Sequence, residues 1–360
     1  MEDKARPVPR SPADWLSWHN GSRSRSLSFL LGVPFRVYAN RRAGFLRHFL
    51  GTFWTIREVL RSRPSTVLLQ NSFMLLLAVS AYKRWAGKDV VVVADCHNKS
   101  LKRRVRGPLG SLFFSIKKWS FDQADIVIVS NHAMLEPARE LSDRVLVLRD
   151  PLPVDFIAKA LDGVLGELAS TPAEFTPPRP YVLFSCSFGQ DEPVESLFLA
   201  AVELSRGKHA AVITGDASRV SVPEPVRRAQ RVFMPGYVSD ASYRALLKQA
   251  SAVVALTEDQ GCLMCAAYEA VAARRPLVVS DTPVLRVCFS DLATYTSNQP
   301  RSIVSAVNQA LSAANGRSLE DARAQFELAF GHEFERLLTR LSDLGARGIA
   351  PRPGSATGIN

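Results

Sequence analysis

Residues Thr257 to Arg286 read TEDQGCLMCAAYEAVAARRPLVVSDTPVLR and contain a helical run followed directly by a strand. Residues 261–275 have the apolar spacing of a helix, and residues 276–281 form a short apolar strand that stops at Ser-Asp-Thr-Pro. One charge, Glu269, lies inside the helical run, among Ala, Tyr and Val. A carboxylate in such surroundings needs a partner. The stretch therefore predicts a helix, a buried strand after it, and a polar partner for Glu269.

The alternation of apolar strands with helical runs extends through the chain. Nearly all-apolar strands are typical of a parallel sheet that is covered on both faces. Such strands are predicted at STVLLQN (65–71), DVVVVADCHN (89–98), ADIVIVSN (124–131), DRVLVLRD (143–150), YVLFSCS (181–187), HAAVITGD (209–216) and SAVVALT (251–257). Two successive alternations predict two doubly wound α/β domains, with ligands at the carboxyl ends of the strands and in the cleft between the domains.

Composition sets the expected boundaries. Residues 169–180, ASTPAEFTPPRP, are rich in Pro and Thr and are interpreted as a linker. The N-terminal domain is then expected over residues 1–168 and the C-terminal domain over residues 181–316. Two further segments are expected to be C-terminal helices (317–345) and a flexible tail (346–360).

The positive charge is concentrated in the first part of the chain. The formal net charge is +11, and residues 1–150 hold 25 Lys and Arg against 12 Asp and Glu, whereas the remainder holds 20 against 22. This asymmetry indicates an anionic partner for the N-terminal half: nucleic acid, an anionic bilayer or a lipid phosphate. A basic face that only keeps the protein in solution is the alternative.

Cysteine usage and apolar runs bear on the compartment. Five cysteines without a paired framework fit a reducing cytoplasm. The start has no apolar core of a signal peptide, and the longest apolar run, residues 72–82, is too short to span a bilayer. Cys262 and Cys265 form a lone C-x-x-C in an apolar run, which we interpret as core rather than as a zinc or redox site.

Small and polar residues follow the strands of the second half, as a ligand site requires. After residues 181–187 comes Gly189, which allows a turn whose N–H groups could face a phosphate, and a helix begins near Glu192. The segment is neither a Walker motif nor a GxGxxG fingerprint.

These segments resemble GT-B glycosyltransferases. TEDQGCLMCAAYEAVAARRPLVVSDTPVLR resembles the family's donor-binding segment, and PGYVSDASYRALLKQASAVVALT (235–257) the strand, helix and strand before it. SFGQDEPVESLFLAA (187–201) and ITGD (213–216) resemble loops of its C-terminal domain. VVVADCHNKS (91–100) and FDQADIVIVSNHAMLE (121–136) look like its N-terminal domain. The resemblance implies the GT-B fold: two Rossmann-like, doubly wound domains with an interdomain cleft.

The resemblance also implies a donor site. In the family the glutamate at the place of Glu269 contacts the nucleotide ribose, which would explain this charge. The implied donor-binding residues are Glu269, Gly189, Thr214, Gly215, Tyr237, Thr257, Glu258, Gly261, Cys262 and Leu263. Many retaining members have a further glutamate eight residues earlier, where this chain has Gly261. Retention or inversion is therefore left open, and the sequence is similar to a divergent branch that includes lipid-linked chitobiosyl mannosyltransferases.

The expected catalytic residues follow a strand of the N-terminal domain. Residues 95–98, DCHN, resemble the Asp-x-His-Asn of the lipid-linked mannosyltransferases. His97 is the expected general base, and Asp95 either orients it or is the base itself. Alternatively, His97 has only a structural role and holds its loop in place. The expected phosphate or acceptor ligands are His19, Arg23, Arg25 and Asn98.

Cations alternate with aromatic residues in the N-terminal half. Residues 41–54 mix Arg with Phe, Leu and Trp, and Lys117 and Lys118 precede Trp119, whereas residues 99–107 form a basic run without aromatic residues. The mixture suits an anionic membrane surface, so we expect peripheral attachment at the inner face of the membrane. No nucleic-acid recognition motif accompanies the charge, and no nucleic-acid partner is expected.

The sequence thus predicts a nucleotide-sugar-dependent hexosyltransferase. It would act on a glycan or polyprenyl-linked acceptor in cell-surface polysaccharide or glycolipid synthesis. No cofactor or metal is expected, because helix dipoles and basic residues can stabilise a departing diphosphate. The alternatives are a sugar-nucleotide epimerase of the same fold and a non-catalytic GT-B-like partner subunit.

Overall fold

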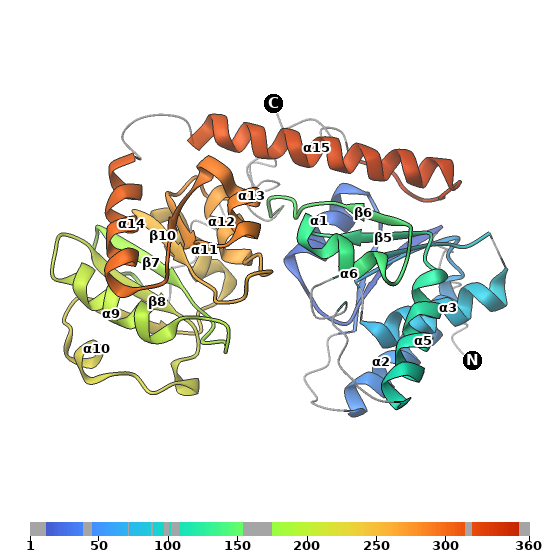
Figure 1. The fold of residues 1–360 in the computed structure, drawn as a ribbon, viewed down its shortest axis with the longest axis horizontal. Coiled ribbons are helices and arrows are strands. Elements are labelled where there is room, and N and C mark those ends of the chain that lie inside the picture. Colours follow the sequence, from blue (N-terminus) through green and yellow to red (C-terminus); the bar gives the residue numbers. More distant parts are fainter. Residues whose placement is uncertain are drawn as a thin grey trace, which may run out of the picture. The chain divides into compact units, whose positions relative to one another are not determined.

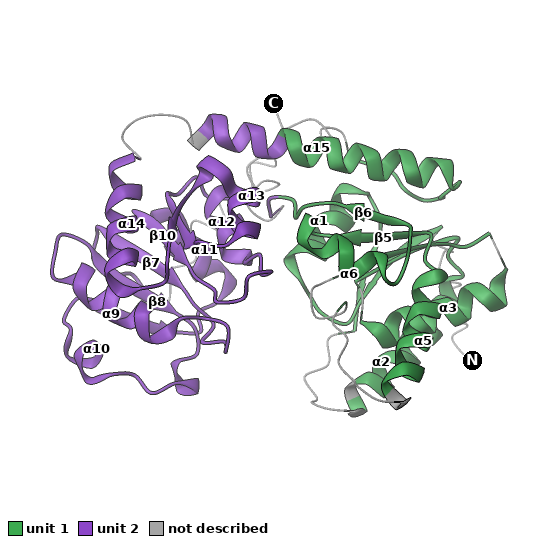
Figure 2. Cartoon of the chain, viewed as in Figure 1, with its two compact units in different colours: residues 1–151, 328–360 green, residues 152–327 purple. Residues whose placement is uncertain are grey.

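The computed structural model describes residues 12–38, 45–70, 72–87, 89–96, 101, 108–153, 175–313 and 319–352. The chain forms two compact units, which Figure 2 shows in different colours. Unit 1 comprises Met1–Pro151 together with Leu328–Asn360, and unit 2 comprises Leu152–Glu327.

Unit 1 is built on a six-stranded parallel sheet with the order β2-β1-β3-β4-β5-β6. Figure 1 labels β5 and β6 of this sheet and the helices α1, α2, α3, α5 and α6 around it. Its strands are β1 (Ala13–Ser17), β2 (Phe35–Val37), β3 (Thr66–Gln70), β4 (Val91–Cys96), β5 (Ile126–Val129) and β6 (Val145–Val147). Its helices are α1 (Ser22–Leu30), α2 (Phe45–Ser62), α3 (Phe73–Ala86), α5 (Pro108–Asp122), η1 (His132–Met134) and α6 (Leu135–Arg139). The strands β3, β4 and β5 are almost wholly buried, because helices cover both faces of the sheet.

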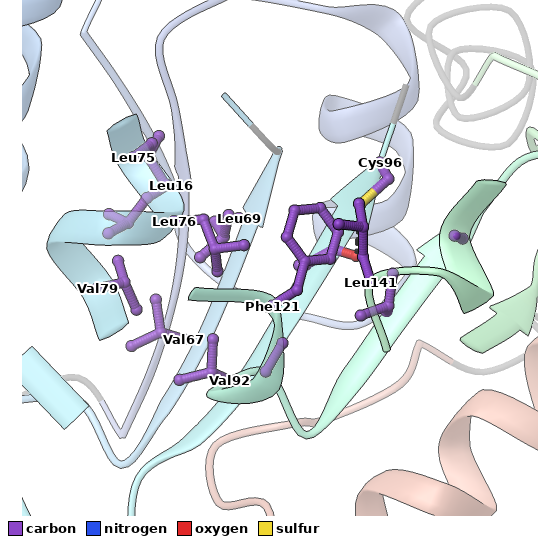
Figure 3. Packing of buried hydrophobic residues seen from close by; sticks show 14 of the residues in the cluster. Leu16, Val67, Leu69, Leu75, Leu76, Val79, Val92, Cys96, Phe121 and Leu141 are labelled. Carbon is purple, nitrogen blue, oxygen red and sulfur yellow. Dashed lines mark hydrogen bonds between the residues drawn. The ribbon is translucent and has the colours of Figure 1, made fainter. Parts of the chain in front are cut away.

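Each face of this sheet has its own core. On one face, residues of α2, α3, α5 and α6 pack against alternate side chains of β3, β4 and β5; Figure 3 shows Leu75, Leu76, Val79 and Phe121 of this cluster. On the other face, Leu27 and Leu31 pack with residues of the last helix. The two-faced cover is the doubly wound arrangement that the sequence predicts.

Unit 2 is built on a second six-stranded parallel sheet, with the order β12-β11-β10-β7-β8-β9. Its strands are β7 (Tyr181–Ser185), β8 (Ala210–Thr214), β9 (Val232–Gly236), β10 (Ala252–Ala255), β11 (Leu277–Ser280) and β12 (Ala293–Thr296). Its helices are α9 (Val194–Ser205), η2 (Ala217–Arg219), α10 (Glu224–Arg228), α11 (Asp240–Gln249), α12 (Cys265–Ala272), α13 (Pro283–Phe289), η3 (Ser290–Leu292) and α14 (Pro300–Ala313).

The sheet of unit 2 is also covered on both faces. Helices α9 and α14 pack on one face, and α11, α12 and α13 on the other. The prediction of two doubly wound α/β domains is confirmed. From β7 the strands run outward to β9, and after α11 they run from β10 to β12 in the other direction, so the direction changes between β7 and β10.

The last helix, α15 (Leu319–Asp343), contributes to both units. Phe326 packs in the core of unit 2, whereas Phe330 and Phe334 pack in the core of unit 1. Glu333 is buried and accepts hydrogen bonds from the backbone N–H of Arg149 at 2.7 Å and from its guanidinium at 2.9 and 3.1 Å. Residues 317–345 are predicted from the sequence as helices separate from both domains, because helical periodicity does not show which core a helix joins.

The segment after α15 also differs from the expected flexible tail. Over residues 346–352 the chain packs on α1, where Ala350 N–H donates to the Leu31 carbonyl at 3.0 Å. The Arg352 guanidinium lies 3.8 Å from the centre of the Phe29 ring. Gly32 has φ +65°, and a Cβ there would lie 2.2 Å from the Ala350 carbonyl oxygen, so the close approach requires glycine.

We predict that Glu333→Ala lowers the free energy of unfolding by about 2 kcal/mol, because it leaves the N–H and guanidinium of Arg149 without their acceptor in a largely buried site. Urea titration followed by circular dichroism measures the change. Glu335→Ala is the matched control, since Glu335 is exposed on the same helix. Equal losses in the two variants would contradict the role given to the Arg149–Glu333 ion pair.

Candidate functional site

A pocket of about 310 Å³ lies at the carboxyl ends of β7, β8 and β9 in unit 2. Its wall comes from three strand ends and from α11 and α12. The lining residues are Ser185, Cys186, Ser187, Thr214, Gly215, Asp216, Arg219, Tyr237, Val238, Asp240, Tyr243, Cys265, Ala266 and Glu269. The carboxyl edge of a doubly wound sheet is where such folds bind ligands.

Gly215 brings two strand ends together at the base of this pocket. Its φ is +116°, and a Cβ at this position would lie 2.2 Å from the Cys186 carbonyl oxygen. Any side chain would therefore push the end of β8 away from the end of β7. The residues on either side, Thr214 and Asp216, both face the pocket.

Glu269 has a partner in Tyr243. The phenol of Tyr243, on α11, hydrogen-bonds to the Glu269 carboxylate on α12 and lies 2.8 Å from the Ser185 hydroxyl at the end of β7. A carboxylate only accepts, so Tyr243 donates to Glu269 and Ser185 donates to Tyr243. Burial and the charge of Glu269 raise the pKa of Tyr243, so the phenol stays protonated at neutral pH. The chain of hydrogen bonds fixes the carboxylate at the pocket wall.

Hydroxyl groups and carboxylates dominate the pocket. Asp216, Asp240 and Glu269 supply three carboxylates, and Arg219 is the one lysine or arginine among the lining residues. Arg219 lies 3.6 Å from Asp216 and is mostly exposed. Carboxylates accept hydrogen bonds from vicinal hydroxyls, so this pocket suits the hydroxyl-bearing part of a ligand better than its phosphates.

Tyr237 gives the pocket an exposed aromatic ring. It follows β9, and 85% of its surface is accessible. An exposed ring beside a polar pocket can stack on a planar ligand group. Val238, next to it, is buried and holds the segment to the core of unit 2.

The loop after β7 differs from its predicted role in phosphate binding. The N–H groups of Ser187 and Gly189 both donate to the Glu192 carboxylate, at 3.0 and 2.6 Å. The Ser187 hydroxyl donates to the same carboxylate at 3.0 Å. Gly189 therefore presents its N–H to an internal anion, and it does not line the pocket. The sequence shows Gly189 and Glu192, but it does not show that the Glu192 carboxylate accepts the Gly189 N–H.

Thr257 and Glu258 lie outside the pocket lining, and each contacts Asp191 of the β7–α9 loop. Thr257 is buried, and its hydroxyl donates to the Asp191 carbonyl at 3.2 Å. Glu258 donates its N–H to the same carbonyl at 2.6 Å, and its side chain is exposed. Thr257 therefore connects the segment after β10 to the β7–α9 loop.

Gly261, Cys262 and Leu263 also lie outside the pocket lining, because α12 begins four residues later than predicted. The Asp259 carboxylate accepts the Gly261 N–H at 2.9 Å, and Met264 is extended before the helix starts at Cys265. Cys265 is exposed at the pocket, so the interpretation of the C-x-x-C as core is wrong for this residue.

Of the ten predicted donor residues, Thr214, Gly215, Tyr237 and Glu269 line the pocket. Tyr243 was not predicted, because its contact with Glu269 depends on how α11 packs against α12, which the sequence does not show. Cys265 was missed because the predicted helix began too early. Among the described residues, none forms a group of three His, Cys, Asp or Glu side chains that could hold a metal ion.

The predicted catalytic segment of unit 1 contains a buried ion cluster. The Asp95 carboxylate, at the end of β4, accepts hydrogen bonds from Nε and Nη2 of Arg23 at 2.9 and 2.8 Å. The Asp150 carboxylate accepts one from Nη1 of Arg23 at 2.5 Å. Arg23 and Asp95 are almost fully buried. Burial alone would lower the pKa of Arg23, but the charges of Asp95 and Asp150 outweigh it and raise the pKa.

This geometry differs from two predicted roles. Arg23 is committed to two carboxylates, so it does not present its guanidinium to a phosphate. Asp95 is held as the partner of Arg23, which suits a positioning role rather than that of a base. Arg25 is half-buried on α1 and His19 is exposed after β1. His97 and Asn98 lie outside the described residues.

Comparison with solved structures shows the fold. A glycosyltransferase from Rickettsia africae ESF-5 is similar over 91% of this chain and 89% of its own, with a TM-score of 0.63 and 10% identity. Anabaena Alr3699/HepE, solved with UDP and glucose, is similar over 92% and 99%, with a TM-score of 0.62 and 12% identity. The UDP-GlcNAc 2-epimerase of Methanocaldococcus jannaschii is similar over 91% and 99%, with a TM-score of 0.56 and 11% identity.

The chain therefore has the GT-B fold, with two Rossmann-like α/β domains. This fold is shared by glycosyltransferases and UDP-GlcNAc 2-epimerases. No protein-family model matches the chain, and no curated protein matches its sequence.

We predict that Cys186 and Cys265, which both line the pocket, differ in their rates of thiol alkylation. Burial and the charge of Glu192 raise the pKa of Cys186 to about 12. At about pH 8 its thiolate fraction is then on the order of one in ten thousand. Exposed Cys265 reacts first with iodoacetamide, and labelling of Cys186 keeps rising with pH to about pH 11. Peptide mass spectrometry follows both sites. Equal rates at pH 8 would contradict the burial of Cys186.

Proposed function

We propose that this protein is a nucleotide-sugar-dependent glycosyltransferase of the hexosyltransferase kind, with its donor nucleotide in the pocket of unit 2. The observation that carries the proposal is the Glu269 carboxylate, held by Tyr243 at the carboxyl edge of the sheet. The GT-B fold and the neighbours solved with UDP support it.

The pocket offers a partner for each part of a nucleoside. Two vicinal ribose hydroxyls would donate to Glu269, as the resemblance of residues 257–286 implies. The exposed ring of Tyr237 would stack on the base. Because three of the lining residues are carboxylates, the diphosphate would lie at the side of the pocket that holds Arg219, the one arginine or lysine of the lining.

The reaction moves one sugar. An acceptor hydroxyl oxygen forms a bond to the anomeric carbon, the bond from that carbon to the phosphate oxygen breaks, and the nucleoside diphosphate leaves with the electron pair. The hydroxyl proton passes to a base, for which we propose His97 on the resemblance of residues 95–98. Asp95, fixed by Arg23, would position the end of β4. We expect no cofactor or metal to be needed.

For the acceptor we propose a glycan or polyprenyl-linked sugar, in cell-surface polysaccharide or glycolipid synthesis. The support is the resemblance of residues 95–98 to lipid-linked chitobiosyl mannosyltransferases and the excess of cations in residues 1–150. The enzyme would then work in the cytoplasm at the inner face of an anionic membrane. Nucleic acid is not proposed as a partner.

A sugar-nucleotide epimerase is the second candidate, because structures of UDP-GlcNAc 2-epimerases are also similar to this chain, with TM-scores from 0.53 to 0.59. An epimerase would alter its sugar nucleotide without any acceptor. A non-catalytic partner subunit is the third, since Gly261 stands where many retaining enzymes have a glutamate. It would bind the nucleotide sugar without turnover.

We predict that one of UDP, GDP and ADP binds with a micromolar Kd and that Glu269→Gln weakens this binding about 10- to 100-fold, because hydrogen bonds to a charged group are worth about 1.5–3 kcal/mol. Tyr243→Phe should weaken it less, since the carboxylate remains but loses its orienting donor. Isothermal calorimetry with EDTA in the buffer measures these constants.

Glu203→Gln is the matched control, because Glu203 is exposed on α9 in the same unit and lies outside the pocket. Its Kd should equal that of the wild type. Selective binding that Glu269→Gln leaves unchanged would remove Glu269 from the donor site. No binding of any of the three nucleotides would contradict the proposed donor pocket as a whole.

A further inference from the structure

Exposed large apolar side chains gather on three helices of unit 1. Fourteen such side chains occur among the described residues, and ten of them lie on α2, α3 and α5. They are Leu46, Phe49, Phe53, Ile56, Leu60, Trp85, Leu112, Phe113, Ile116 and Trp119, which together we call the apolar helix face. The other four are scattered over unit 2 and the last helix, so this concentration is a feature of one surface.

On α2 the exposed side chains form a continuous stripe. Leu46, Phe49, Phe53, Ile56 and Leu60 follow one another at alternating spacings of three and four residues. This spacing puts them on one side of the helix. On α5, Leu112, Ile116 and Trp119 repeat the pattern, with Phe113 beside them. Both stripes keep between a third and two thirds of each side chain accessible.

The helices that carry these stripes are firmly packed on their inner sides. A Cβ at Gly51 of α2 would lie 2.7 Å from the Trp18 ring, and the Trp18 indole N–H donates to the Thr55 hydroxyl at 3.0 Å. The Ser80 hydroxyl of α3 donates to the Ser120 carbonyl of α5 at 3.1 Å.

All three helices pack against the same face of the sheet, and α3 contacts both α2 and α5. Their exposed residues therefore share the outer surface of one helical layer.

Cations outnumber acids by four to one among the exposed charged side chains described on these three helices, and the acid is Asp122 at the end of α5. Exposed cations on the three helices are Arg57, Arg61, Arg84 and Lys118. In the sequence there is no acid between Asp14 and Glu58, or between Asp95 and Asp122.

We propose that the apolar helix face docks on an anionic bilayer, with its aromatic and aliphatic side chains at the boundary of headgroups and acyl chains and the neighbouring cations on lipid phosphates. Among the described residues, no helix has the length and apolar character that crossing a membrane requires. The inference deepens the membrane part of the proposed function by naming the surface and the lipid class.

Charge favours a membrane over a second copy of the chain. The alternation of three and four residues on α2 would also suit a coiled coil with another α2. Such a contact would gather the cations of both copies, while Glu58 of α2 is half-buried and lies 3.6 Å from Arg36 within its own chain. Like charges repel, whereas anionic headgroups attract the same residues.

Flotation of the full chain on vesicles tests the inference. One set is phosphatidylcholine alone and the other contains about one third phosphatidylglycerol. The wild type should float with the anionic set and remain mostly unbound on the neutral set, and raising the salt should weaken the binding. Phe49→Ser with Phe53→Ser should reduce the bound fraction of the anionic set about tenfold or more.

Leu199→Ser with Val287→Ser is the matched control, because both residues are exposed apolar side chains of unit 2. This control should float like the wild type. Two outcomes overturn the inference: equal flotation on both vesicle sets, or no flotation together with a dimer in light scattering that the Phe49 and Phe53 changes abolish. Nucleotide calorimetry on the same samples separates failure of this surface from failure of the donor site, since the two lie in different units.

Discussion

A carboxylate on a short apolar helix constrains how unit 2 can pack. Glu269 interrupts a helix whose neighbouring side chains, Tyr268 and Ala270, are buried. Its charge is tolerated because Tyr243 donates to it and Ser185 donates to Tyr243 in turn. The three residues come from α12, α11 and the end of β7, so one chain of hydrogen bonds ties together the three elements that meet at the pocket. Gly215 completes the arrangement by letting β8 end against β7.

The two units use charge differently. In unit 2 carboxylates and hydroxyls line the pocket, and its one guanidinium lies beside a carboxylate. In unit 1 the cations divide into two kinds. Arg23 is buried between Asp95 and Asp150, where it fixes strand ends. Others, such as Arg57 and Lys118, are exposed beside apolar side chains. A count of charges along the sequence cannot distinguish these kinds, because the distinction depends on which cations find buried partners.

Much of the fold could be predicted from the sequence. Apolar strands such as Val91–Cys96 carry a strong signal, since both faces of a parallel strand are buried. Short elements were harder: α10 and β12 have little periodicity, and α15 looks the same in sequence whichever core it joins.

At the site, residues that follow strands were predictable, as Thr214 and Gly215 show. Contacts such as those of the Tyr243 and Glu192 side chains depend on tertiary packing, so they could not be predicted from the sequence.

In the proposed function, the Glu269 carboxylate binds the ribose of a nucleotide in the pocket of unit 2. A crystal structure of the chain with UDP would show whether this contact forms. We expect both ribose hydroxyls within hydrogen-bonding distance of the Glu269 carboxylate, with the base against Tyr237. A nucleotide that is well ordered elsewhere, with Glu269 still bonded only to protein groups, would contradict it.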